Sequence, residues 1–225
     1  MSVFHNADGK RVLMGMVKAV QENKAYLGEV DGLIGDGDHG MNMNKGFSMF
    51  AEQFGDKDFE FSEGLEALGM ILMNQIGGSM GPIYGTIFMD MAEAGEGMDE
   101  IGAGELVRML EAGFEGLCDI VEARVGDKTL VDTLAPAIDA LNNAAGENKN
   151  FAEALDEMKA AAKAGQDSTK DMAAKYGRSS RLGERSRGVL DAGAVSCCII
   201  LCAMADGIKE FLDRPASDKA EYTIR

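Results

Sequence analysis

Apolar side chains recur at helical spacing along most of this chain, and this pattern decides its fold class. One example is the set Val12, Leu13, Met16, Val17 and Val20, which returns an apolar residue every three or four positions. That spacing places side chains on one face of an α-helix. No stretch alternates between apolar and polar residues over a length convincing for a β-strand. The sequence therefore predicts an all-α protein.

The pattern divides into about eight helical segments separated by short polar or glycine-rich breaks. They are one or two helices over residues 12–30, followed by helices over 43–54, 62–75, 83–94, 105–123, 130–144, 151–176 and 192–212. Pro136 either bends its helix or marks a late start, and Gly165 is a candidate kink in the helix that follows. The last segment is apolar nearly all round, which is typical of a helix at the centre of a fold.

Short connections between these helices indicate one up-and-down bundle of antiparallel helices. No linker-like stretch and no internal repeat divides the sequence. Residues 1–212 are therefore predicted to form a single domain, and residues 213–225 a polar C-terminal tail. Hydrophobic residues make up 46% of the chain, which is enough for one core.

The chain is strongly acidic, which limits its partners. Lys and Arg number 22 against 38 Asp and Glu, giving a formal net charge of −16 at pH 7. Nucleic acid and anionic membranes are disfavoured as partners, because both attract basic surfaces. Small anionic ligands are not excluded, because a bound metal ion can invert the field locally.

The N-terminus and the cysteines predict a cytoplasmic protein. Residues 1–8 lack the basic start and apolar run of a signal peptide, and the apolar stretch 192–205 is too short to span a bilayer. No His or carboxylate is spaced to complete a zinc site with the cysteines. We interpret these as free, mostly buried thiols of a reducing compartment. They are Cys118, Cys197, Cys198 and Cys202.

Three aspartates fall in the glycine-rich stretch from residue 31 to residue 40. Asp31, Asp36 and Asp38 are spaced by glycines, and both residue types disfavour a helix interior, so this acidic stretch is predicted to be a loop. Converging carboxylates repel one another unless a cation lies among them, and Mg²⁺ suits that position. A solvated acidic loop is the alternative. An EF-hand is excluded, because counting from Asp36 places Met41 where that motif requires glycine.

Three further loops have groups that suit phosphate binding. Residues 77–82 form a glycine cluster that leads into a helix, whose free N–H groups and dipole favour an anion, although a tight turn is the alternative. Residues 125–129 form a polar turn, and residues 177–188 carry four arginines. Alternate loops of an antiparallel bundle gather at one end, so all of these loops are candidates for one site.

A site of this kind fits nucleotide binding through Mg²⁺, with phosphoryl transfer catalysed by positioning and charge neutralisation. The only histidines are His5 and His39, and no nucleophilic side chain stands out. No catalytic side chain is therefore assigned. Neither a P-loop nor the glycine-rich loop of protein kinases is present in the sequence.

Four ordered motifs give the chain a close resemblance to a known family. They are IGDGDHGMNMNKGF at residues 34–47, GGSMGP at 77–82, GDKT at 126–129, and GERSRG at 183–188 followed by DAG at 191–193. Together they resemble the nucleotide-binding L subunits of dihydroxyacetone kinases. The resemblance covers residues 12–211, nearly the whole chain. It implies a barrel of about eight antiparallel helices with a nucleotide bound at one end.

The resemblance also implies which residues form the site. Asp31, Asp36 and Asp38 would hold two Mg²⁺ ions that bridge the phosphates of ADP or ATP. Backbone N–H groups of the 78–80 turn would bind phosphate, and Leu130 would pack near the base. For Arg178, a solvated surface position is the alternative to phosphate contact. The implied nucleotide-binding residues are His39, Gly40, Met41, Asn42, Gly78, Ser79, Met80, Leu130, Arg178, Asp191, Ala192 and Gly193.

Two motifs depart from the usual pattern of the family. Met80 stands where a hydroxyl is expected, because the serine of the glycine cluster lies one place earlier, at Ser79. Residues 187–192 also differ from the familiar sequence, with Arg187, Val189, Leu190 and Ala192 as the replacements. That loop is expected to face the substrate-carrying partner, so the ketose or the partner can differ from the one usual in the family.

By resemblance, the chain is expected to be the kinase subunit that phosphorylates dihydroxyacetone or a related short ketose held on a separate K subunit. Its bound ADP would be rephosphorylated by a phosphohistidine protein of the phosphoenolpyruvate-dependent phosphotransferase system. One alternative is an ATP-dependent kinase of ketotrioses or ketotetroses with an exchangeable nucleotide. Another is a nucleotide-dependent regulatory subunit. No nucleic acid or membrane is expected to be bound directly, and a homodimer is left open.

Overall fold

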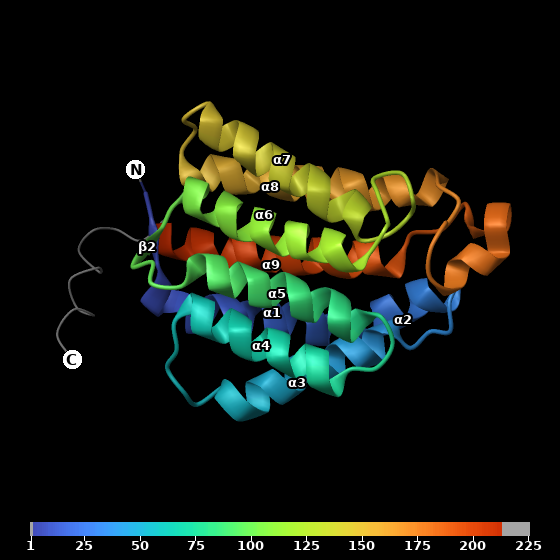
Figure 1. The fold of residues 1–225 in the computed structure, drawn as a ribbon, viewed down its shortest axis with the longest axis horizontal. Helices are drawn as coiled ribbons and strands as arrows, with labels where there is room; N and C mark the ends of the chain where they lie inside the picture. Colours follow the sequence, from blue (N-terminus) through green and yellow to red (C-terminus); the bar gives the residue numbers. More distant parts are fainter. Residues whose placement is uncertain (1, 213–225) are drawn as a thin grey trace.

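The computed structural model of the protein describes residues 2–212 and is an all-α domain, as expected (Figure 1). The tail expected at 213–225 lies outside the described residues. Nine α-helices make up most of the described part of the chain. They are α1 (Gly9–Glu22), α2 (Lys24–Gly32), α3 (His39–Phe54), α4 (Phe61–Gln75), α5 (Met80–Gly95), α6 (Ala103–Ile120), α7 (Val131–Gly146), α8 (Phe151–Ser168) and α9 (Ala192–Leu212).

The helix boundaries differ from the expected ones in ways that local hydrogen bonds explain. The stretch 12–30 is two helices, α1 and α2, divided at Asn23, whose side-chain amide donates to the Ala19 carbonyl. Helix α8 ends at Ser168 and not at residue 176, and the 3-10 helix Thr169–Asp171 follows it. The Ser168 and Thr169 hydroxyls donate back to carbonyls of the last turn and satisfy them where the helix ends.

Several short elements were not expected from the sequence, including the 3-10 helix Asn6–Asp8. Strands β1 (Phe4–His5) and β2 (Glu100–Ile101) form one antiparallel pair, and two residues are too few to show alternation. The arginine-containing stretch, expected to be a loop, includes the 3-10 helix Arg178–Ser186. Gly183 interrupts that helix with φ = 54°, a value that a residue with a Cβ rarely adopts.

The helices that follow one another pack side by side, α4 against α5, α5 against α6, and α7 against α8. Gly165 does not kink α8 but brings it close to α7, because a Cβ there would lie 2.1 Å from the Asp132 carbonyl oxygen. Pro136 lies within α7, so that helix does not start late. The expected kink at Gly165 is therefore wrong, because the glycine serves helix packing.

Helix α9 runs through the middle of the fold and packs against α1, α7 and α8 (Figure 1). Among the described residues it is the one helix whose length and composition would allow a membrane span, but 61% of that window is buried inside the protein. Its burial fits the central helix that the sequence predicted. All four cysteines are free thiols, and Cys197 and Cys198 are buried within α9.

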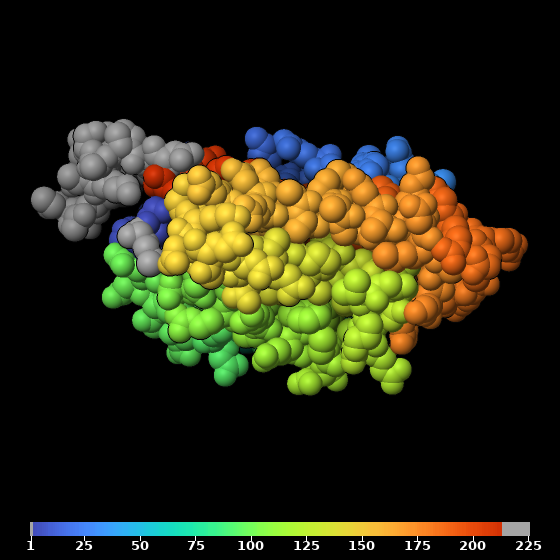
Figure 2. All heavy atoms as spheres, turned by 90° about the horizontal axis from the view of Figure 1, so that it is seen from above, coloured from blue at the N-terminus to red at the C-terminus, as the bar shows by residue number. Residues whose placement is uncertain are grey.

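The connections α2–α3, α4–α5, α6–α7 and α8–α9 gather at one end of the molecule (Figure 1). The pair β1 and β2 lies toward the opposite end. Figure 2 shows the orange α8–α9 connection forming the tip of the molecule on the side of the gathered loops. The antiparallel arrangement thus brings four loops together that lie far apart in sequence.

Candidate functional site

The four gathered loops enclose a cavity of about 800 Å³. Residues of five stretches line it, within 31–42 of the acidic loop and α3, within 77–84 around the start of α5, within 120–131 before α7, at 176–179 in the α8–α9 connection, and at 191–193 where α9 begins. A volume of this size is in the range of pockets that hold ligands as large as a nucleotide.

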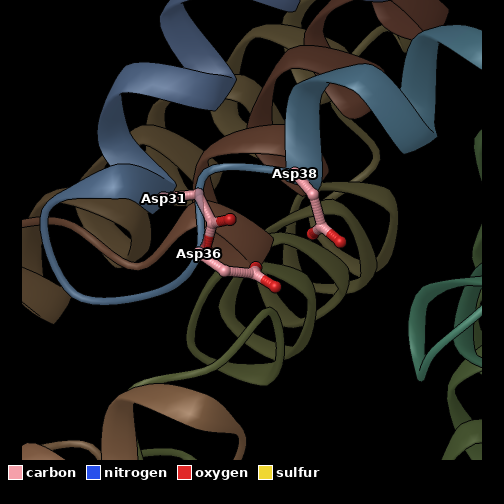
Figure 3. Close-up of side chains that lie close together, drawn as sticks. All are labelled: Asp31, Asp36 and Asp38. Atoms are coloured by element: carbon pink, nitrogen blue, oxygen red, sulfur yellow. The ribbon is translucent and has the colours of Figure 1, made fainter.

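The three aspartates lie together on one side of this cavity. Asp31 lies at the end of α2, Asp36 in the loop and Asp38 directly before α3 (Figure 3). One carboxylate oxygen from each lies within 4.8 Å of the other two. The loop is tight because Gly37 adopts φ = 76° and the Gly35 N–H donates to the Asp31 carbonyl at 2.6 Å.

This carboxylate cluster fits a hard divalent cation. Carboxylate oxygens are the ligands that Mg²⁺ prefers, and three carboxylates supply them without any soft ligand. Arg178 forms an ion pair with Asp36. Among the ion pairs of the described residues, no other cationic side chain contacts the three aspartates. The carboxylates of Asp31 and Asp38 therefore have no positive side chain paired with them.

The Gly77 cluster provides the N-terminus of α5 at the cavity wall. Gly78 has φ = 73°, a left-handed conformation that turns the chain into the helix at Met80. The first N–H groups of an α-helix have no partner within the helix and favour an anion in front of them. Met80 is one of the residues that line the cavity, and its side chain also packs against the hydrophobic core.

A chain of hydrogen bonds lies at the base of the cavity and joins three helices. His39 Nε2 lies 2.8 Å from the Ser196 Oγ, and that Oγ lies 2.6 Å from the Tyr84 hydroxyl. Burial lowers the pKa of His39 to about 4, while the nearby Asp31 carboxylate acts in the opposite direction. The imidazole is therefore neutral at physiological pH and cannot supply a positive charge to the site.

The start of α9 forms the opposite wall. The Asp191 side chain accepts a hydrogen bond from the Ala194 N–H at 2.8 Å and so caps the helix. Burial raises the pKa of Asp191 to about 6, and the Ala194 N–H and the Lys128 ammonium oppose that shift. Gly193 lies against Leu130, because a Cβ on it would be 3.7 Å from the Leu130 Cβ. The apolar part of the wall is thus placed beside a half-buried carboxyl.

Comparison with family models matches residues 33–206 to the DAK2 domain. The chain belongs to the DAK2 domain family. The match covers more than half of the sequence and includes all four of the gathered loops except Asp31 and Gly32 at the start of the first.

Relatives of this DAK2 chain include whole kinase subunits. The phosphoenolpyruvate-dependent dihydroxyacetone kinase 1, ADP-binding subunit DhaL, of Listeria innocua is 37% identical over 186 residues, which are 82% of this chain and 88% of the relative. The corresponding subunit of Escherichia coli is 37% identical over 188 residues, 82% and 89% of the two chains. The L-erythrulose kinase of Pectobacterium atrosepticum is 31% identical, but only 32% of its length is matched.

Two solved structures share the fold of this DAK2 chain. The dihydroxyacetone kinase of C. freundii in its native form has a TM-score of 0.69 at 21% identity, over 90% of this chain and 35% of that one. The same kinase in complex with AMP-PNP and Mg²⁺ has a TM-score of 0.68 at 20% identity, over 92% and 35%. These likenesses confirm the expected helical fold.

Most of the expected site residues of the DAK2 chain line the cavity, and two do not. Gly40 and Met41 are absent from the wall. Gly40 packs against α2, where a Cβ would lie 2.0 Å from the Lys24 carbonyl oxygen, and Met41 is exposed. Their expected place against the nucleotide therefore stays a prediction. Those that line the cavity are Asp31, Asp36, Asp38, His39, Asn42, Gly78, Ser79, Met80, Leu130, Arg178, Asp191, Ala192 and Gly193.

Sequence reasoning missed several residues of the DAK2 cavity. Tyr84 and Tyr176 belong to its wall, and Ser196 lies beneath it. Lys128 also lines the cavity and is only 1% exposed. The GDKT motif at residues 126–129 was a sequence signal for Lys128, because it singled out the turn that contains this lysine. Nothing local in the sequence indicated Tyr84 or Ser196, because helical spacing assigns both simply to buried faces.

Proposed function

We propose that this chain is the ADP-binding subunit of a phosphoenolpyruvate-dependent dihydroxyacetone kinase. The observation that carries the proposal is the meeting, in one cavity, of a carboxylate cluster and a helix N-terminus. The first attracts a divalent cation and the second attracts phosphate. The relatives support the proposal, because the chain is 37% identical to two ADP-binding subunits and matches 88% and 89% of their lengths.

In this proposal Asp31, Asp36 and Asp38 hold two Mg²⁺ ions. Bound Mg²⁺ would neutralise charge on the nucleotide phosphates and orient them for in-line transfer. Three carboxylates offer two oxygens each, which is enough to share between two ions. The carboxylates and backbone groups supply positioning and charge, so no side chain of the site is needed as a nucleophile.

The remaining wall residues would bind the nucleotide itself. The backbone of Gly78, Ser79 and Met80 at the start of α5 would bind phosphate oxygens. Arg178 would also contact phosphate. Two observations favour this contact over a purely solvated position, because Arg178 lines the cavity and pairs with Asp36. Leu130 would pack against the base. The other residues proposed to contact the nucleotide are His39, Asn42, Asp191, Ala192 and Gly193.

The proposed reaction needs two partner proteins. A K subunit would hold dihydroxyacetone or a related short ketose, and a phosphohistidine protein would rephosphorylate the bound ADP. Arg178 of the connection from α8 to α9 lines the cavity, and three more arginines follow it in the same connection of a protein of net charge −16, so this connection is the part of the chain suited to an acidic partner surface. All of these steps would take place in the cytoplasm.

The nucleotide content of the purified protein tests the proposal. The protein is dialysed against buffer that contains Mg²⁺ but no nucleotide, and the ADP that remains is measured. We expect ADP to be retained and phosphoenolpyruvate to support dihydroxyacetone phosphorylation once both partners are added. Rapid loss of ADP together with turnover on added ATP would instead favour the ATP-dependent alternative. Absence of nucleotide binding and of turnover would contradict both.

A further inference from the structure

Lys128 is a buried lysine that the site described above does not use. It is only 1% exposed, and its backbone has φ = 61°, in the left-handed region. Both features are costly, because an ammonium group loses its hydration on burial and a Cβ is strained at that φ. A residue that keeps two unfavourable features at one position is held there by specific contacts.

The contacts of Lys128 join two points that are far apart in sequence. Its Nζ donates to the Thr169 carbonyl oxygen at 2.6 Å and to the Val189 carbonyl oxygen at 2.5 Å. Thr169 follows the end of α8, and Val189 lies just before α9. These two residues are the ends of the long connection between the helices, which we call the arginine segment (residues 169–189).

The arginine segment forms one side of the cavity. Tyr176, Gly177, Arg178 and Ser179 line it, and Arg178 reaches across to Asp36. Other hydrogen bonds also close the segment at its base, from the Gly188 N–H to the Lys170 carbonyl at 2.8 Å and from the Asp191 N–H to the Thr169 Oγ1 at 3.1 Å. The Lys128 ammonium differs from these bonds because it comes from a different part of the chain.

The turn that carries Lys128 is itself rigid. The buried Asp132 carboxylate accepts from the Gly126 N–H at 2.5 Å and from the Thr129 N–H at 2.8 Å. Lys128 is therefore presented from a fixed turn at the start of α7. Both of its acceptors are main-chain carbonyls, so the contact does not depend on which side chain occupies position 189.

We propose that Lys128 is a positioning residue that fastens both ends of the arginine segment to the turn before α7, and thereby holds Tyr176 and Arg178 at the nucleotide cavity. The consequence for nucleotide binding rests on the proposed function. The effect of Lys128 on the conformation of the arginine segment does not depend on that function. Burial lowers the pKa of the Lys128 ammonium, while the Asp191 carboxylate opposes that change and favours the charged, donating form.

Hydrogen exchange of the Lys128→Met variant tests this proposal. Methionine keeps most of the apolar stem but cannot donate to the two carbonyls. Amide exchange in residues 169–191 is expected to become about tenfold faster or more, with exchange in α4 and α5 unchanged. The matched control is Lys175→Met, because the Lys175 ammonium also links this segment to the turn, through Asp127, but its side chain is 64% exposed. That control is expected to exchange like the wild type.

A second readout separates positioning from general loss of structure. In Lys128→Met, ADP is expected to dissociate about tenfold faster or more, while Mn²⁺ added without nucleotide binds the aspartates as in the wild type. If Lys128→Met does not fold, Lys128→Gln keeps one N–H donor group and should show the same changes to a smaller extent. Unchanged exchange in residues 169–191 of a folded variant would overturn the proposal. Failure of the wild type to bind ADP would contradict the proposed function alone, since the exchange measurement would still decide the role of Lys128.

Discussion

The carboxyl groups of the cavity differ in how they are held. Asp31, Asp36 and Asp38 share one side and remain open to a cation, whereas Asp191 is half-buried and caps α9. Burial disfavours the charged form of Asp191, and the Ala194 and Gly193 N–H groups with the Lys128 ammonium only partly compensate. The chemistry of each carboxyl is thus set by its own surroundings and not by the net charge of the chain.

The raised pKa of Asp191 predicts a pH-dependent cost to stability. Its pKa is about 6 in the folded protein, against 3.8 for an unperturbed aspartate. The folded state therefore binds the proton more tightly, so the cost is absent below pH 4 and complete above pH 6. Relative to the wild type, Asp191→Asn should gain about 2 to 3 kcal/mol in unfolding free energy between pH 4 and pH 7. Urea unfolding at both pH values measures this change, and a pH-independent difference would refute it.

Cys202 is predicted to be the most reactive of the four thiols. A hydrogen bond between the Cys198 and Cys202 thiols, at an Sγ–Sγ distance of 4.0 Å, lowers the pKa of Cys202 against the opposing effect of burial. The thiolate is the form that reacts, so iodoacetamide at pH 7 should label Cys202 first. Mass spectrometry of the digested protein identifies the site. Cys202→Ser should remove the fast phase and Cys118→Ser should leave it, and equal rates at both positions would contradict the assignment.

At the scale of the helices, close packing depends on a few residues without a side chain. Helices α7 and α8 meet where Gly165 faces the Asp132 carbonyl. The same Asp132 holds the turn of Lys128 through its carboxylate. The contact between the two helices is therefore connected directly to the geometry of the cavity.

Substitution at this helix contact should be costly. A Cβ on Gly165 would lie 2.1 Å from the Asp132 oxygen, so Gly165→Ala must push α7 and α8 apart. We expect a loss of about 1 to 3 kcal/mol in unfolding free energy. Gly15→Ala in α1 is the control, because no atom lies within 4 Å of its added Cβ, and alanine should stabilise the helix there by up to about 1 kcal/mol. Chemical denaturation compares the two, and equal effects would contradict the packing argument.

At the scale of the whole molecule, the sequence was sufficient to predict the helical class and the gathering of the loops. Helical periodicity is local, and antiparallel topology then places alternate loops at one end. The contact of His39 with Ser196 could not be predicted in the same way, because it joins residues 157 positions apart. The buried link from Lys128 to Thr169 and Val189 also depends on tertiary contacts alone.

The family resemblance predicted which residues bind the nucleotide, and the backbone conformation determines which of these residues line the cavity. Gly40 and Met41 follow His39 directly, yet the close contact of Gly40 with α2 fixes the start of α3 in a way that takes both away from the wall. Adjacent positions on a helix face different directions. A motif therefore identifies a segment of the site, while the packing of that segment determines which of its residues line the cavity.

The central claim is that the three aspartates bind the cation that carries the nucleotide, and one calorimetric titration tests it most directly. Asp36→Ala is compared with Asp58→Ala, an exposed aspartate in the connection from α3 to α4 that pairs with Lys10. Removing a residue that only hydrogen-bonds to a metal ligand typically costs about 10- to 100-fold in metal affinity. Removing a direct ligand should therefore weaken binding of Mg²⁺-ADP by at least about 100-fold. Circular dichroism of both variants should remain helical. Affinity for Mg²⁺-ADP that is unchanged in Asp36→Ala would contradict the account.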